Sequence, residues 1–65
     1  MLVKCYRSRL PTVEQDELSL YVQRVGGWLS VSYGYVDYYI PEPYAMMAAL
    51  YDSHIERISR LDYIV

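Results

Sequence analysis

The sequence has no phenylalanine and only one cysteine and one histidine among its 65 residues. A lone cysteine cannot form an internal disulfide, and a chain without a Cys/His cluster has no ligand set for a structural zinc. Glycine and proline are scarce too, with three of each, and no linker, internal repeat or low-complexity segment is recognisable. We therefore expect no metal and no cofactor, and a fold that depends on packing or on association with a partner.

Strong charge of either sign is also missing. Six basic and eight acidic residues give a net charge of −2, which is too small for a polybasic nucleic-acid binder or for a DNA mimic. No apolar run approaches the roughly 18 residues of a membrane span, and no secretory signal is visible. A single free thiol suits a reducing compartment. These absences predict a cytoplasmic protein without membrane contact, and they disfavour nucleic acid as the partner.

Apolar and aromatic residues are abundant, at 54% of the chain. A domain of this size buries only roughly 60% of the surface that its unfolded chain exposes. Some of the apolar excess should therefore reach the surface. This predicts a protein that associates with itself, as a homodimer, or with another protein.

The first segment, residues 2–9, mixes Val, Cys and Tyr with three cations, Lys4, Arg7 and Arg9, and predicts a strand. The cations are interpreted as protection of an edge strand against pairing with other chains. A phosphate-facing edge is the alternative interpretation.

The next segment predicts a helix over residues 12–25. Thr12 can cap its first turn while Gln15 bonds back to the cap, and three acids lie at the positive end of the helix dipole. The acids are Glu14, Asp16 and Glu17. Apolar residues follow one helix face from Leu18 onward, and Gly26 stands where a left-handed residue commonly ends a helix.

The segment after this helix alternates apolar and polar residues, and the parity of the alternation changes at Gly34. The change predicts strands over 28–33 and 35–40, joined by a tight turn at Tyr33-Gly34; a bulge at Gly34 is the alternative. The hairpin register pairs Val31 with Val36 and Leu29 with Tyr38 facing the helices, and Ser30 with Asp37 and Trp28 with Tyr39 on the opposite face.

A second helix is predicted over residues 43–61, because Pro43 suits the first helical turn and apolar residues repeat with helical spacing. Residues 62–65 are expected to form a short apolar tail. One flank of the helix carries a second apolar strip, which we expect to form the homodimer contact. Its residues are Met46, Leu50, His54 and Leu61.

Together these segments predict a single α+β domain of β-α-β-β-α order, with a three-stranded, mostly antiparallel sheet packed by two helices. The alternative is a βββα order, in which residues 18–25 form a strand that is paired with the next one through Gly26-Gly27.

Few residues in the chain can carry catalysis. Cys5 and His54 would have to lie within hydrogen-bond reach to form a nucleophile–base pair, and both are interpreted as packing or interface residues. Asp52 and Glu56 lie one helical turn apart, but two carboxylates make a weak cation site. The glycines form no phosphate-binding loop. The protein is therefore not expected to be an enzyme.

Nine tyrosines and no phenylalanine indicate rings that keep a polar tip at a half-wet surface. The expected partner-binding residues are Trp28, Tyr33, Tyr35, Asp37 and Tyr39. We expect a protein-binding inhibitor or adaptor, for example a phage- or mobile-element-type inhibitor of a host protein. The alternatives are a single-stranded nucleic-acid module that stacks bases on tyrosines, and an antitoxin or small structural subunit.

Overall fold

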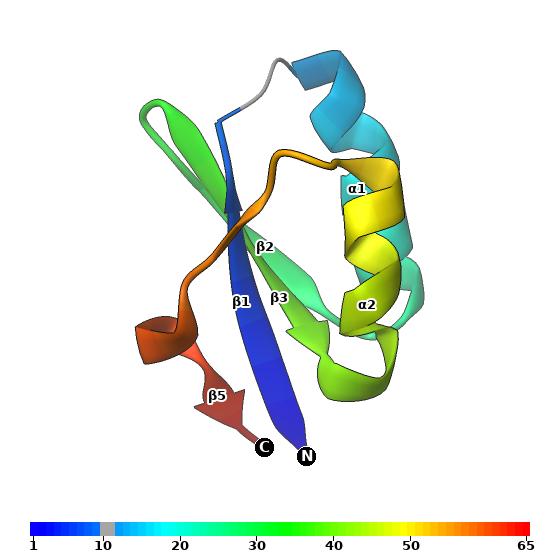
Figure 1. Ribbon diagram of the computed structural model, residues 1–65, viewed down its shortest axis with the longest axis vertical. Helices are drawn as coiled ribbons and strands as arrows, with labels where there is room; N and C mark the ends of the chain where they lie inside the picture. The colour runs from blue at the N-terminus through cyan, green and yellow to red at the C-terminus, as the bar shows by residue number, and fades with distance from the viewer. Residues whose placement is uncertain (10–11) are drawn as a thin grey trace.

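The computed structural model describes residues 1–9 and 12–65, without the side chains of residues 12–16. The elements in chain order are β1 (Leu2–Ser8), α1 (Thr12–Arg24), β2 (Trp28–Ser32), β3 (Tyr35–Pro41), α2 (Glu42–Tyr51), β4 (Glu56–Arg57), the 3-10 turn η1 (Ser59–Leu61) and β5 (Tyr63–Ile64). The fold is a small α+β fold, as predicted (Figure 1). Its sheet contains five strands rather than the three expected.

β1 lies at the centre of this antiparallel sheet. The strand order is β2-β3-β1-β4, and β5 pairs with β1 as well. β3 occupies one edge of β1, while β4 and β5 pair with successive parts of the other edge. The interpretation of β1 as a protected edge strand is therefore wrong, because the chain returns at its C-terminus to pair with it.

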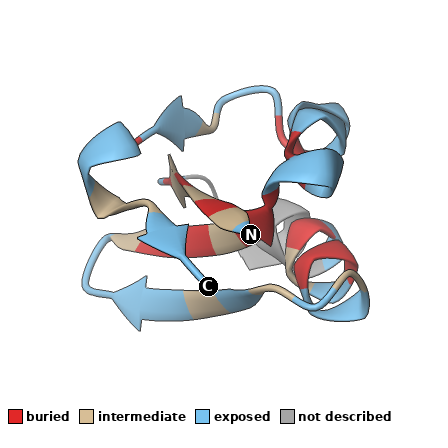
Figure 2. Cartoon of the chain, turned by 90° about the horizontal axis from the view of Figure 1, so that it is seen from below, coloured by how far each residue is buried: buried red, intermediate tan, exposed pale blue. Residues whose placement is uncertain are grey.

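Both helices lie on one face of the sheet, and η1 and β5 lie on the other side of β1 (Figure 1). The main core fills the space between helices and sheet. Its buried residues are Leu18, Tyr21, Val22, Val36, Tyr38, Ile40, Ala45 and Ala48. Buried positions concentrate in the central strands and on the inner sides of the helices, whereas β2 is mostly exposed (Figure 2). β2 is thus the unprotected border of the sheet.

The predicted first helix is confirmed as α1. Its end has the hydrogen bonds of a Schellman motif: the Gly27 N–H donates to the Val22 carbonyl at 2.8 Å and the Gly26 N–H to that of Gln23 at 3.3 Å. Gly26 has the left-handed φ of +88° that this motif requires. The alternative strand over residues 18–25 is therefore wrong. The predicted cap by Thr12 and Gln15 lies outside the described side chains.

The β2–β3 hairpin has the predicted register, with Leu29 opposite Tyr38 and Trp28 opposite Tyr39. The turn at Tyr33-Gly34 places Gly34 at φ +88°, a conformation that glycine adopts without steric cost. The parity change in the sequence thus marks a turn and not a bulge.

The predicted second helix is too long, since α2 ends at Tyr51 and not near residue 61. Asp52 adopts an extended conformation directly after it, and its side chain is buried. The Asp52 carboxylate accepts the Ser8 hydroxyl at 2.6 Å and the His54 backbone N–H at 2.9 Å. This tie to β1 turns the chain away from the helix axis.

The chain beyond Asp52 returns to the sheet instead of continuing as a helix. β4 pairs Arg57 with Tyr6, and β5 pairs Tyr63 with Val3. Residues 62–65 are therefore in part a strand, not the predicted apolar tail. Between these two short strands, Ile58 donates its backbone N–H to the Cys5 carbonyl at 3.0 Å. This bond holds the C-terminal segment along β1.

Candidate functional site

Three aromatic rings meet on the sheet face that the helices leave uncovered. The rings of Trp28 and Tyr39 are stacked, with centroids 5.3 Å apart and an interplanar angle of 12°. The Tyr63 ring forms a T-shaped contact with both, with its centroid 5.8 Å from that of Trp28 and 5.5 Å from that of Tyr39. We call Trp28, Tyr39 and Tyr63 the aromatic cluster.

Strand pairing places each ring of the aromatic cluster. Trp28 and Tyr39 are directly opposite in the β2–β3 register, so their side chains leave the sheet on the same face. Cys5 is the β1 partner of Tyr39. Tyr63 reaches the same face because β5 pairs with β1 at Val3. The rings therefore come from β2, β3 and β5, and β1 is the strand that pairs with both β3 and β5.

The aromatic cluster is only half covered. Trp28 keeps 40% of its surface exposed and Tyr63 keeps 53%, while Tyr39 is intermediate. Burial raises the pKa of the Tyr39 hydroxyl above its ordinary value, so this group stays protonated and remains a donor at neutral pH. The cluster thus offers flat apolar area with polar tips at its rim, a combination enriched at protein interfaces.

Next to the aromatic cluster, an ion pair occupies the same face. Arg7 donates from Nε to Asp37 Oδ1 at 2.8 Å and from a terminal nitrogen to Oδ2 at 3.1 Å. The Arg7 guanidinium also lies 4.0 Å from the centroid of the Tyr35 ring. Asp37 is buried and both of its oxygens bind Arg7, so little of its surface is available for the predicted partner contact. It fixes Arg7 in place instead.

The remaining predicted partner residues differ in position. Trp28 and Tyr39 lie together in the aromatic cluster, and Tyr35 lies half-buried under Arg7. Tyr33 is fully exposed at the β2–β3 turn, and this turn lies away from the two helices (Figure 1). The prediction did not include Tyr63, since residues 62–65 had no pattern that indicated a strand.

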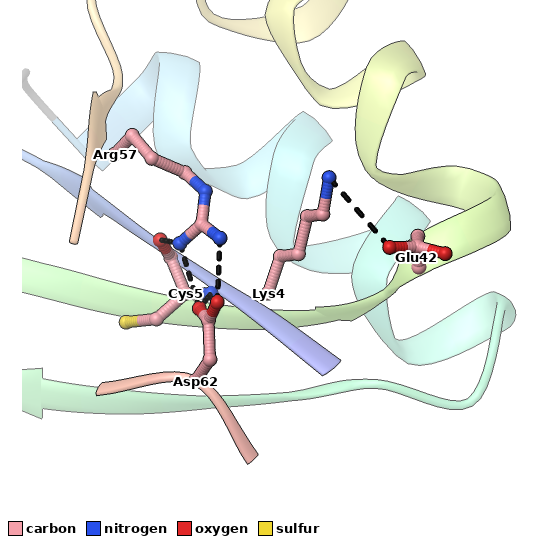
Figure 3. Close-up of polar contacts among 5 residues, drawn as sticks. All are labelled: Lys4, Cys5, Glu42, Arg57 and Asp62. Carbon is pink, nitrogen blue, oxygen red and sulfur yellow. Dashed lines mark hydrogen bonds and ion pairs between the residues drawn. The ribbon is translucent and has the colours of Figure 1, made fainter. Parts of the chain in front are cut away.

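A second charged group closes the β1 edge near β5. Asp62 accepts the Cys5 N–H at 3.0 Å and two bonds from Arg57, at 2.6 and 2.5 Å (Figure 3). Arg57 also donates to the Cys5 carbonyl at 3.2 Å. The Arg57 bonds lower the pKa of the Asp62 carboxyl. This arrangement is structural, because it satisfies backbone groups of β1 that no strand pairs.

The cysteine has no features of a nucleophile. Cys5 is fully buried, and burial raises the pKa of its thiol, which keeps it protonated at neutral pH. His54 lies in the exposed turn after Asp52, where its ring Nδ1 is 3.4 Å from the Ser53 hydroxyl. Among the described residues no group of three or more His, Cys, Asp or Glu side chains is placed to hold a metal ion.

An open pocket of about 420 Å³ lies at the β1–β4 edge. It is lined by Arg7, Arg9, His54, Ile55 and Glu56. Arg9 and Glu56 form an exposed ion pair across it at 2.8 Å, and Arg7 is held by Asp37. The pocket therefore has its charges largely neutralised.

The four residues predicted for self-association do not share one surface. Met46 and Leu50 are strongly exposed on α2, at 87% and 76%. His54 follows the end of this helix, and Leu61 lies half-buried in η1. The single helix flank that linked them does not exist, because the helix ends at Tyr51.

Comparison of the chain with protein-family models, with curated proteins and with solved structures found no match. In the described part of the chain no helix is long and apolar enough to cross a membrane.

Proposed function

We propose that the protein acts by binding another protein through the aromatic cluster, as an inhibitor or adaptor and not as an enzyme. The observation that carries this proposal is the half-exposed group of Trp28, Tyr39 and Tyr63 on the helix-free face. Tyrosine and tryptophan bring large contact area with few rotatable bonds, so ordering them on binding costs little conformational entropy. Rings of this kind dominate the binding energy of many interfaces.

Pre-organisation supports the same proposal. The stacked pair of Trp28 and Tyr39 is fixed by the strand register, and Tyr63 is held against it by β5. A surface that is already ordered loses less freedom when a partner binds. The small size and the composition of the chain fit an inhibitor of the kind carried by phages and mobile elements, acting in the cytoplasm.

Self-association belongs to the proposal as well. Met46 and Leu50 expose apolar area on α2, and Val31 and Ile64 expose more elsewhere. A chain of this size leaves these groups in water unless another molecule covers them. Homodimerisation is the simplest means of covering them.

A single-stranded nucleic-acid module is the second candidate, since exposed rings on a sheet can stack bases. The three cations within residues 2–9 weaken it, because each one faces a carboxylate. Lys4 lies 3.9 Å from Glu42, Arg7 binds Asp37 and Arg9 binds Glu56. Fluorescence anisotropy with labelled oligonucleotides at low salt tests this candidate; tight binding that weakens as salt rises would favour it over a protein partner.

The test of the protein-binding proposal is affinity capture from a lysate of the encoding organism, with quantitative mass spectrometry. Wild-type protein is compared with Trp28→Ala and Tyr63→Ala, and with Tyr44→Ala as the matched control. Tyr44 exposes a similar fraction of its surface, but on α2. The proposal expects one set of proteins to be retained by wild type and by the control, and lost from both cluster variants.

Each cluster substitution is expected to weaken affinity by roughly 1 to 3 kcal/mol, the range of an interface hot spot. Circular dichroism melts establish that the variants remain folded. Equal capture by wild type and both folded cluster variants would contradict the proposal.

A further inference from the structure

Within the described residues, β2 is an edge strand: it pairs with β3 on one side and with no strand on the other. It also contains no charged residue. Its five residues, Trp28–Ser32, contain no Lys, Arg, Asp, Glu or Pro. Their pairing with β3 runs without interruption, so no bulge twists the strand away. Natural sheets usually protect such an edge with charge, proline or a bulge, because its free backbone groups are a template for another strand.

The opposite border of the sheet is protected in this way. β4 and β5 are two residues long, and β4 consists of Glu56 and Arg57. Arg57 and Asp62 further occupy backbone groups of β1 beside it. The two edges of the sheet therefore differ in length and charge, and of the two only β2 is suited to pair with another strand.

The hairpin register determines which groups β2 presents. Ser32 and Tyr35 flank a two-residue turn, so they exchange both hydrogen bonds, and the pairs alternate from there. Ser30 and Trp28 then bond to β3, while Leu29 and Val31 direct their N–H and C=O groups outward. The same alternation is visible across β1, where the Cys5 N–H and carbonyl, opposite Tyr39, bind groups on the side away from β3.

We infer that β2 of one copy pairs antiparallel with β2 of a second copy, about a twofold axis at Ser30. In this register Leu29 of each copy lies opposite Val31 of the other, and both residues present outward N–H and C=O groups. Four backbone hydrogen bonds form, and no outward group of β2 is left without a partner. The inference rests on the proposed self-association and assigns its interface.

The side chains of β2 are self-complementary in the same register. On the helix side of the sheet, apolar Leu29 meets apolar Val31, and Val31 is otherwise 73% exposed. On the other face Ser30 meets its own copy at the axis, and Trp28 meets Ser32. The chain's own sequence thus supplies a match at both faces of the strand, which is why a second copy is the occupant inferred here.

Pairing about this axis also extends the site. The axis is perpendicular to the sheet, so both aromatic clusters lie on one face of a continuous sheet and both helix pairs on the other. Trp28 and its copy are then roughly 14 Å apart, because they are offset by four residues along the strand direction and lie on adjacent strands. A dimer would thus present two aromatic clusters to one partner.

Cross-linking tests the register directly. Residues at the axis form a pair without hydrogen bonds, with Cα atoms about 4.5 Å apart, a separation that a disulfide accepts. Ser30→Cys is therefore expected to form a disulfide-linked dimer under mild oxidation, roughly tenfold or more faster than Ser32→Cys. Ser32 is the matched control, since it is equally exposed on the same strand but lies roughly 14 Å from its copy. Cys5 is buried and does not compete.

Equal cross-linking of both variants would indicate random collision and would overturn the inference. In parallel, sedimentation of wild type at tens of micromolar is expected to show twice the 7.7 kDa monomer mass. Val31→Lys, which adds an edge charge, should give monomer, and Met46→Lys on α2 should leave the dimer intact. A monomeric wild type overturns self-association as well, whereas a dimer that only Met46→Lys dissociates overturns the β2 interface while self-association stands.

Discussion

At the scale of single residues, Asp52 marks the point where the chain leaves the α2 axis. It is the first residue after α2, its side chain is buried, and it binds Ser8 on β1 and the His54 backbone. A carboxylate held by two donors stabilises the turn, whereas a helix continued through this position would leave the Ser8 hydroxyl without that acceptor. One side chain therefore directs the C-terminal segment back to the sheet.

Asp52→Ala is expected to lower the free energy of unfolding by about 2 to 3 kcal/mol, because hydrogen bonds to a charged group are lost within the protein. Urea unfolding followed by circular dichroism measures this loss. Ser53→Ala is the control, since Ser53 is the exposed neighbour and a surface change of this kind is worth less than about 0.5 kcal/mol. Similar losses in both variants would show that Asp52 is not the residue that holds the turn.

Asp62 gives a pH dependence of defined sign. Its bonds with Arg57 lower its pKa in the folded protein, so its contribution to stability is fully present above the ordinary carboxyl pKa of about 4. That contribution is lost as the pH falls through the lowered pKa. Wild type should therefore exceed Asp62→Asn in stability by a constant amount from pH 7 to pH 5, and by progressively less below about pH 4.

Urea midpoints of wild type and Asp62→Asn, measured across this pH range, test the expectation. A stability difference that grows on acidification would contradict the assigned ion pair. The exposed pair of Arg9 and Glu56 offers a comparison, because Glu56→Gln should change stability little at any pH.

At the scale of elements, the junction of α1 and β2 sets the position of the hairpin. Gly27 lies where the Schellman motif passes into β2, and a Cβ on it would lie 2.2 Å from the Tyr39 carbonyl oxygen and 2.9 Å from Val22 Cγ1. Only a residue without a side chain allows the strand to approach the helix so closely.

Gly27→Ala is expected to lower the free energy of unfolding by roughly 3 kcal/mol or more, since backbone must move to relieve the overlap. Gly34→Ala is the matched control: its Cβ would enter open space, and only the left-handed φ costs about 1 to 2 kcal/mol. Thermal melts of both variants test the order. A larger loss for Gly34→Ala would show that the hairpin turn, not the junction, limits this part of the fold.

The elements formed by local signals were predictable from the sequence. The capped, periodic segment after Pro11 indicated α1, and the parity change at Gly34 indicated the hairpin and its register, because both patterns involve neighbouring residues. The C-terminal segment was not predictable, since Ile55 and Ile58 continue the helical spacing by coincidence. What ends α2 is a contact between Asp52 and Ser8, which are 44 positions apart.

In the candidate site too, local sequence signals were predictable and long-range contacts were not. Trp28 and Tyr39 could be placed on one face, because the hairpin register follows from the sequence. Tyr63 could not, since β5 reaches the cluster only through its pairing with β1. The face of Asp37 could be predicted as well, but its ion pair with Arg7 could not, because β1 was expected at an edge of the sheet and not beside β3.

At the scale of the whole molecule, three of the places that expose apolar groups differ in chemistry. They are the aromatic cluster, the β2 edge with Val31, and the outer side of α2 with Met46 and Leu50. The first combines stacked rings with polar tips, the second presents backbone groups, and the third presents the flexible side chains of Met46 and Leu50. These differences are the reason why we propose a protein partner for the first and a second copy of the chain for the second.

The most direct test of the central proposal is site-specific photo-cross-linking in cells of the encoding organism. A photoreactive phenylalanine analogue replaces Tyr63 in the aromatic cluster or, as control, Tyr44 on α2. We expect a discrete cross-linked adduct with another protein from position 63, and none of that mass from position 44. Adducts that form from position 44 and not from position 63 would contradict the aromatic cluster as the binding surface.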